Sequence, residues 1–168
     1  ENTPYGSHQD DVELHKSKHF ENLNKCISTM VSNYANGIFE HKKGEYAYEI
    51  TAMWLNCTKP NDMHSPHCHH NSLWSGVFFL NGEKGEFPPL SLLHPFPEHF
   101  HLKYEKYNDF NQNGHCFDAI KDRIILFPSA VQHYVEINKT KKIRKTIAFN
   151  IIARGEYDHP YRLQSVTI

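Results

Sequence analysis

The segment Pro66-His-Cys-His-His-Asn-Ser-Leu-Trp-Ser-Gly-Val-Phe-Phe-Leu80 joins a histidine cluster to an apolar run that is typical of a buried β-strand. His67 and His69 lie two positions apart, and residues two apart on an extended chain project from the same face. Both imidazoles can therefore bind one metal ion, while Cys68 faces the opposite side and His70 points away. The segment predicts a metal site at the entrance to a strand.

A third candidate ligand lies far downstream, in Arg123-Ile-Ile-Leu-Phe-Pro-Ser-Ala-Val-Gln-His133-Tyr-Val135. This stretch is typical of a strand, a turn and a histidine that enters the next strand, so the chain can return beside the first two ligands. His64 would reach the same ion only through a bend. The cluster could instead be an exposed histidine-rich loop, or part of a structural zinc site on Cys68 and Cys116.

Composition limits the classes of function. The chain has 168 residues, and 39% of them are hydrophobic, which is enough for one core and one domain, 1–168. Its 18 basic and 19 acidic residues nearly cancel, so we expect no nucleic-acid or membrane partner and a small-molecule or side-chain substrate instead.

Three further expectations concern the environment of the protein. The four cysteines are spread without a CxxC pair, which favours reduced thiols. No apolar run approaches the ~20 residues of a membrane span, and the first residues lack signal-peptide character, so we expect a cytoplasmic protein. The oligomeric state stays open, a homodimer included.

The hydrophobic pattern predicts one helix followed by strands. Residues 17–36 carry apolar side chains at spacings of three and four, as in a helix that packs on a sheet. Period-two alternation or short apolar runs then predict strands at 47–56, 75–80, 123–127 and 143–152. Several short strands after one helix indicate a mainly β sandwich or barrel, with its core at 47–152. Residues 83–118 have little periodicity, and we expect a long excursion that packs on the barrel, with a lid or a substrate wall as alternatives.

The strand predicted at 143–152 places Arg144, Thr146, Ala148 and Asn150 on one face. Small and polar residues make a poor core surface but a good cavity lining. An arginine that points inward must meet an anion, because an unpaired buried charge is very costly, and a carboxylate that accepts two hydrogen bonds is the natural partner. The alternative is that Arg144 pairs with an acidic residue of the protein or is exposed.

Together these motifs resemble the iron(II)/2-oxoglutarate-dependent oxygenase family of marine bacteria and phages, in the prolyl-hydroxylase-like superfamily. The matching segments are 54–56, 67–80, 126–135 and 144–150, in order along the chain. The resemblance implies a double-stranded β-helix, a cupin-like jelly roll with an N-terminal supporting helix, whose mouth holds Fe(II) on His67, His69 and His133. It also implies that Arg144 binds the distal carboxylate of 2-oxoglutarate, with Thr146, Asn150 and Asn56 as further cofactor-binding residues.

The chain departs from the wider superfamily at two positions. His69 stands where most members have Asp or Glu, so three histidines would replace the two-His-one-carboxylate triad and leave the iron one unit more positive. In an alternative frame Asn71, or a water molecule, takes the place of the acid. Phe79 stands where relatives often have a tyrosine that helps to hold 2-oxoglutarate, and Thr146 or Asn150 could compensate.

The resemblance thus implies an Fe(II)- and 2-oxoglutarate-dependent dioxygenase that uses dioxygen to hydroxylate an unidentified substrate and releases succinate and CO2. No catalytic residue beyond the metal ligands is required. Three alternatives stay open: a cupin-type three-histidine metalloenzyme that does not use 2-oxoglutarate, a non-catalytic metal-binding barrel, and a zinc hydrolase, which lacks an acidic residue near the cluster to act as a base.

Overall fold

The computed structural model describes residues 11–95, 103–108, 111–158 and 165–168. Two short 3-10 turns, η1 (Leu14–Lys16) and η2 (Lys18–Phe20), lead into the helix α1 (Glu21–Gly37). Ten strands follow: β1 (Ala47–Thr58), β2 (His64–His67), β3 (Trp74–Phe79), β4 (Leu90–Leu93), β5 (Gly114–Phe117), β6 (Ile124–Pro128), β7 (His133–Val135), β8 (Arg144–Arg154), β9 (Glu156–Asp158) and β10 (Ser165–Thr167). No described helix has the length and apolar character needed to cross a bilayer.

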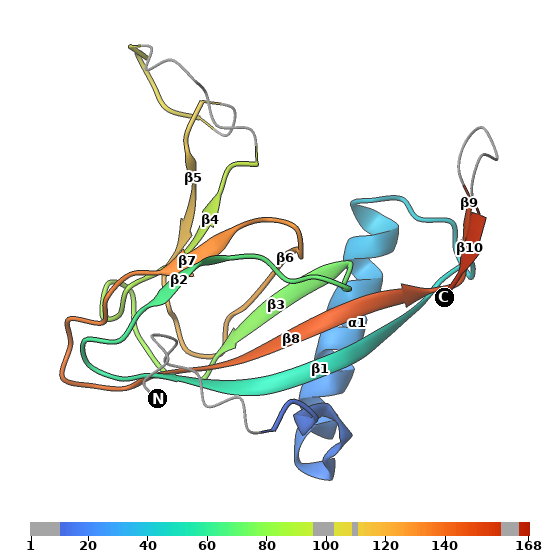
Figure 1. The fold of residues 1–168 in the computed structure, drawn as a ribbon, viewed down its shortest axis with the longest axis horizontal. Coiled ribbons are helices and arrows are strands. Elements are labelled where there is room, and N and C mark those ends of the chain that lie inside the picture. The colour runs from blue at the N-terminus through green and yellow to red at the C-terminus, as the bar shows by residue number, and fades with distance from the viewer. Residues whose placement is uncertain (1–10, 96–102, 109–110, 159–164) are drawn as a thin grey trace.

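The first eight strands form two antiparallel four-stranded sheets (Figure 1). The major sheet has the order β1-β8-β3-β6 and the minor sheet the order β2-β7-β4-β5, while β9 and β10 pair separately. Each connection from β1 to β8 crosses between the sheets, except the β4–β5 hairpin, which stays in the minor sheet. This is the strand order of a jelly roll, so the predicted double-stranded β-helix is confirmed.

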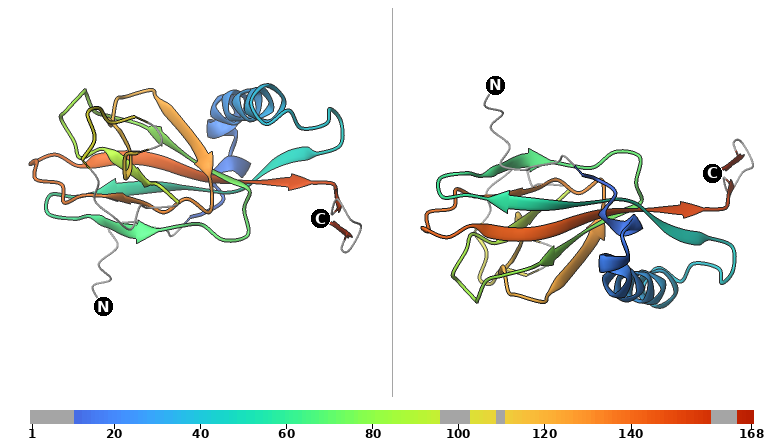
Figure 2. Two further views of the ribbon diagram at one scale, coloured as in Figure 1. Left: turned by 90° about the horizontal axis from the view of Figure 1, so that it is seen from above. Right: turned by 90° about the horizontal axis from the view of Figure 1, so that it is seen from below.

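The central strands of the major sheet, β3 and β8, are largely buried on both faces, whereas the edge strand β1 is partly exposed. Helix α1 covers the outer face, as Figure 2 shows, and inserts Ile27, Val31 and Ala35, which are fully buried. The spacing of four between these residues makes one helical stripe. The inner face meets the minor sheet through a second cluster that includes Val77 and Phe79. Alternate residues of β3 serve the two clusters, whereas β8 gives Ile147, Phe149 and Ile151 to the cluster under α1 and its other face lines a cavity.

A close approach between β3 and β8 requires a glycine. Gly76 is the register partner of Phe149, and a Cβ at position 76 would lie 2.2 Å from Cζ of the Phe149 ring. Phe149 is fully buried on the side of α1. The glycine thus lets the ring of one strand lie across the backbone of the other.

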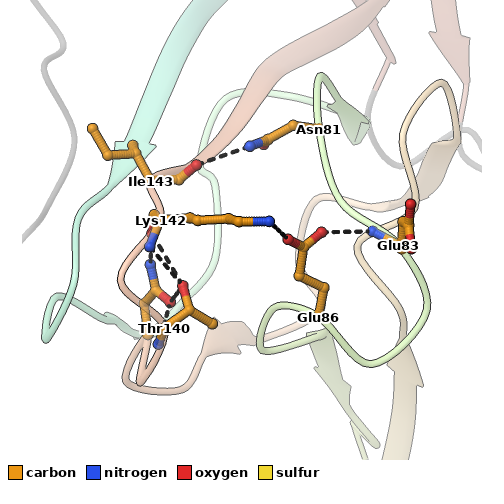
Figure 3. Close-up of polar contacts among 7 residues, drawn as sticks. Asn81, Glu83, Glu86, Thr140, Lys142 and Ile143 are labelled. Atoms are coloured by element: carbon orange, nitrogen blue, oxygen red, sulfur yellow. Dashed lines mark hydrogen bonds and ion pairs between the residues drawn. The ribbon is translucent and has the colours of Figure 1, made fainter.

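The loop from β7 to β8 is held on both sides. The buried Asn138 donates from Nδ2 to the carbonyl oxygens of Thr58 and Lys142. Figure 3 shows Lys142 reaching Glu86, at 2.6 Å, and Asn81 donating to the carbonyl of Ile143. These contacts fix the point at which β8 begins, and Arg144 is its first residue.

Two expectations about local structure are wrong. The stretch 83–118 is not only an excursion, because it contains β4 and β5, half of the minor sheet. The histidine pair does not share a strand, because β2 ends at His67 and His69 follows it. The strands predicted at 47–56, 75–80, 123–127 and 143–152 correspond to β1, β3, β6 and β8.

Candidate functional site

A cavity of about 630 Å³ opens between the two sheets. From β8 it is lined by Arg144, Thr146, Ala148 and Asn150, as the alternation along this strand predicts. The rest of the lining comes from β1, β3 and the minor sheet: Trp54, Asn56, His64, His67, His69, His70, Val77, Leu90, His133, Tyr134 and Val135. No carboxylate lies among the described residues that form this lining.

The cavity brings together the three histidines that are distant in the sequence. His67, at the end of β2, is the register partner of His133, at the start of β7. His69 lies two residues beyond β2, and its ring centroid is 5.0 Å from that of His133. One nitrogen from each of the three imidazoles lies within 4.8 Å of the others, which is close enough for one metal ion to contact all three.

Each imidazole of this triad, His67, His69 and His133, uses Nδ1 for a hydrogen bond to the protein. Nδ1 of His67 lies 2.7 Å from the carbonyl oxygen of Ser65, and Nδ1 of His133 lies 3.1 Å from that of Val131. A carbonyl accepts only, so both rings carry the proton on Nδ1 and present the lone pair of Nε2. Ligating histidines are oriented in this way in metal sites, since the second nitrogen fixes the tautomer.

The third member, His69, is held by side chains. Its Nδ1 lies 2.6 Å from Oδ1 of Asn150 and 3.0 Å from Oγ of Ser75. Ser75 also donates to Oδ1 of Asn150 and lies 2.8 Å from Oγ of Ser129. Ser75 and Ser129 are fully buried, so this network fixes the ring from behind. Nε2 of His69 is therefore available for the cavity, as in the other two rings.

Burial keeps the imidazoles of His69 and His133 neutral. Desolvation lowers the pKa of His133 to about 4 and lowers that of His69 as well, and the hydrogen bond of His69 to Asn150 opposes the shift only in part. A neutral imidazole is the form that binds a metal, so no proton has to leave at pH 7.

Arg144 is 2% exposed and, among the described residues, has no acidic partner. Its Nε and Nη2 are buried and without a hydrogen-bond partner, and the guanidinium lies 5.3 Å from the centroid of the Phe79 ring. Desolvation lowers the pKa of Arg144 to about 10, so it remains a cation at pH 7. Nε–H and Nη2–H share one edge of the guanidinium, the arrangement that binds a carboxylate through two hydrogen bonds.

Three other residues singled out in the sequence lie where they can contact a bound molecule. Thr146 is buried at the cavity wall, and Asn56 faces the cavity from β1. Trp54 donates from Nε1 to Oδ1 of Asn56, at 3.1 Å, which leaves the amide NH2 of Asn56 for other acceptors. Asn150 lines the cavity, but its Oδ1 is already used by His69 and Ser75.

The other residues singled out in the sequence near the histidine cluster lie outside the triad. Asn71 is exposed with a φ of 56°, a left-handed conformation that asparagine tolerates, so its position serves a turn. Cys68 and Cys116 are free, and neither joins a cluster of potential metal ligands among the described residues. His70 is exposed and lies outside the triad, and it also contributes to the cavity wall. Within 83–118, the possible substrate wall, residues 96–102 and 109–110 lie outside the described residues, whereas Phe87 and Leu90 pack in the buried core.

One residue of the cavity, His64, has no clear signal in the sequence. Its ring lies in the cavity wall, and its Nε2 is 2.9 Å from Oγ1 of the buried Thr58. The spacing of three from His67 does not predict a shared face on a strand. The irregular register between His64 and His67 in the β2–β7 pair supplies the bend that the alternation rule lacks.

The fold and site define a class, the double-stranded β-helix proteins with a metal site between their sheets, and solved structures share this fold. A Pseudomonas putida prolyl-4-hydroxylase aligns with a TM-score of 0.58 and 14% identity, over 83% of this chain and 69% of that one. A Trichoplax adhaerens prolyl hydroxylase, in complex with a peptide of hypoxia inducible factor, gives 0.55 and 17%, over 88% and 60%. A 2OG-Fe(II) oxygenase family oxidoreductase from Burkholderia pseudomallei gives 0.50 and 12%, over 74% and 57%.

The family itself follows from the sequence match. Residues 52–150 match the family model described as "Putative 2OG-Fe(II) oxygenase", and the chain belongs to this family. The family implies Fe(II) and 2-oxoglutarate as cofactor and cosubstrate, in agreement with the expectation from the motifs. Among curated proteins none matches the chain. The chain spans 57% of the Burkholderia structure and 60% of the Trichoplax structure.

Proposed function

We propose that this protein is an Fe(II)- and 2-oxoglutarate-dependent dioxygenase that hydroxylates its substrate, with His67, His69 and His133 as the iron ligands. Nε2 of each ring binds the metal in this proposal, because Nδ1 of each ring is taken by a protein acceptor or by the Asn150 and Ser75 pair. Three protein ligands leave positions at the metal for the cosubstrate and for dioxygen.

The observation that carries the proposal is the buried, unpartnered edge of Arg144 in the same cavity as the triad. A cation in this position is costly unless an anion enters, and 2-oxoglutarate brings a carboxylate for Arg144 and a 2-oxo acid group for the metal. The charges in the cavity also favour an anionic ligand. Three neutral imidazoles leave Fe(II) with both positive charges and Arg144 adds a third, whereas the lining offers no carboxylate to offset them.

The residues of the chain bind and orient the reactants. Arg144 would hold the far end of the cosubstrate and thereby set the approach of the 2-oxo acid group to the metal. Thr146 and Asn56 offer hydrogen bonds along the wall, and Val77, Leu90 and Val135 exclude water from the inner part of the cavity. No described side chain has to act as a general base.

Fe(II) would supply the activation of dioxygen, so that one oxygen atom ends in succinate and the other in a new hydroxyl group, with release of CO2. The hydroxylated C–H bond would belong to a small molecule or side chain. Trp54, whose ring centroid is 5.6 Å from that of His69, and Tyr134 are aromatic walls that such a substrate would meet.

Anaerobic reconstitution tests the proposal. The protein loaded with Fe(II) should bind 2-oxoglutarate with a charge-transfer absorption that the Arg144→Ala variant shows only at much higher cosubstrate concentration. Admission of air should then release succinate, measured by mass spectrometry. Neither absorption nor succinate in the wild-type protein would sink the oxygenase assignment.

A second candidate is a three-histidine dioxygenase that does not use 2-oxoglutarate. Two observations favour it: the ligand set has no carboxylate, and Phe79 offers the buried arginine only a ring face. This candidate predicts that iron binds, that 2-oxoglutarate does not, and that oxygen uptake with substrate survives Arg144→Ala.

A further inference from the structure

His64 lines the same cavity as Arg144 and His67, the residues at the two ends of the proposed cosubstrate site. It faces the cavity from the start of β2, and both Arg144 and His67 are close enough to act on its charge. Arg144 marks the carboxylate end of the cavity and His67 the metal end. Thr58, which lies 2.9 Å from the ring, is the register partner of Arg144 across the β1–β8 pair. His64 is thus built into the same corner as the unpartnered guanidinium.

The hydrogen bond to Thr58 uses one ring nitrogen of His64 and leaves the other. Nε2 of His64 lies against Oγ1 of Thr58, and no described protein group pairs with Nδ1. A neutral ring that accepts the Thr58 hydroxyl proton at Nε2 carries its own proton on Nδ1. Burial and the neighbouring Arg144 both lower the pKa of His64, to about 4, so the ring is neutral beside the cation. In this tautomer His64 offers one N–H donor.

We propose that Nδ1–H of His64 donates to the same carboxylate of the cosubstrate that Arg144 binds, with Thr58 fixing the tautomer. The inference rests on the proposed function. His64 would then be the third hydrogen-bond donor to that carboxylate, beside the two of Arg144, whereas the neighbouring Phe79 offers none. His64 would therefore help to select a 2-oxo acid that has a second carboxylate.

Two other roles for His64 have less support. As a fourth metal ligand it would need a free lone pair near the triad, but it does not belong to the cluster that could share one ion, and its Nε2 is engaged by Thr58. As a purely structural core histidine it would have a partner on each nitrogen or an apolar surrounding, whereas its ring borders the cavity.

The test compares two ligands on the full chain loaded anaerobically with Fe(II). Calorimetry gives the affinities for 2-oxoglutarate and for 2-oxopentanoate, in which a methyl group replaces the distal carboxylate. His64→Leu should weaken 2-oxoglutarate binding by about tenfold to a hundredfold, because a hydrogen bond to a charged group is lost, and should leave 2-oxopentanoate binding unchanged. His64→Asn should restore most of the affinity, since its amide nitrogen can replace Nδ1.

Thr58→Val provides a second variant if His64→Leu does not fold. It removes the hydroxyl group and keeps the shape, so it should lower only 2-oxoglutarate affinity, by a few-fold. If the variants lose equal affinity for both ligands, or lose none for 2-oxoglutarate, the role of His64 is overturned. The oxygenase assignment still holds in that case, provided that the wild-type protein binds 2-oxoglutarate. Failure of the wild-type protein itself to bind 2-oxoglutarate would overturn both.

Discussion

Asn150 and His69 form the contact that orients the third proposed metal ligand. Asn150 accepts from Nδ1–H of His69 and from the hydroxyl group of Ser75, so one amide oxygen orients the ring of His69. The prediction that Asn150 binds the cosubstrate stays a prediction, and its Oδ1 is occupied by these two donors. The side chain acts first on the metal ligand.

Asn150→Ala should therefore weaken metal binding. Loss of the acceptor leaves His69 free to rotate or change tautomer, and the affinity for Fe(II) should fall about 10-fold to 100-fold. Anaerobic titration of the apoprotein measures it. Asn56→Ala is the matched control, because Asn56 faces the same cavity but its only described side-chain bond is to Trp54, so metal affinity should not change. Equal effects of the two variants would refute the role assigned to Asn150.

His64 and His133 make the stability of the apoprotein depend on pH. Both have a folded-state pKa of about 4, well below the ordinary value of 6.5, because burial disfavours their charged forms. Between these values the unfolded chain binds more protons than the folded protein, so the free energy of unfolding should fall as the pH drops from 6.5 toward 4.

Urea denaturation of the apoprotein at several pH values checks this dependence. We expect a loss on the order of 2 kcal/mol for each histidine. His64→Asn should remove part of the slope. A free energy of unfolding that stays constant between pH 6.5 and 4.5 would contradict the lowered pKa values of His64 and His133.

At the scale of elements, the packing of β3 against β8 rests on Gly76. A Cβ there would lie 2.2 Å from the fully buried ring of Phe149, which has α1 packed beyond it. Gly76→Ala should lower the free energy of unfolding by roughly 1–3 kcal/mol, the cost of overpacking a closed core. Gly37→Ala, at the end of α1, meets nothing within 4 Å and should be neutral or slightly stabilising. Thermal unfolding of both variants tests the contrast.

A second contact between elements comes from Asn138, whose side chain joins the β7–β8 loop to the end of β1. Asn138→Ala would leave the carbonyl oxygens of Thr58 and Lys142 without this donor and should cost roughly 1–3 kcal/mol. Lys142→Ala breaks an ion pair whose lysine side chain is 72% exposed, and it should cost less than about 1 kcal/mol. A larger effect of Lys142→Ala in denaturant unfolding would show that the exposed contacts in Figure 3 hold the loop.

The two sheets differ in how well the sequence predicts them. The strands of the major sheet have apolar residues in alternating or continuous patterns, because its central strands are buried on both faces and β1 alternates between exposed and less exposed residues, and all four were predicted. The strands β4 and β5 have four residues each, and β5 is half exposed, so neither carries a periodic signal. The proposed metal ligands, near the end of β2 and at the start of β7, were predicted from residue type and spacing, whereas His64 depends on an irregular register that no periodicity describes.

At the scale of the whole molecule, Arg144 lowers the stability of the ligand-free protein and favours the binding of an anion. The unpartnered guanidinium is buried at the wall of the cavity between the two sheets. An uncompensated buried cation destabilises the folded protein, and a bound dianion would remove that cost. The empty and the liganded states should therefore respond in opposite directions to removal of this charge.

Arg144→Met tests this opposition, because methionine keeps much of the length and packs against Phe79. Without ligand, the variant should be more stable than the wild-type protein by roughly 1–3 kcal/mol. With Fe(II) present in both samples under argon, addition of 2-oxoglutarate at a hundred times the wild-type Kd should stabilise the wild-type protein by about 2.7 kcal/mol further and the variant by almost nothing. Arg154→Met on the same strand, which loses only an exposed pair with Glu49, should change neither quantity. The same thermal unfolding series measures the stability without ligand and the gain on adding ligand. If Arg144→Met is less stable than the wild-type protein without ligand, the guanidinium stabilises the fold and is not reserved for an anion.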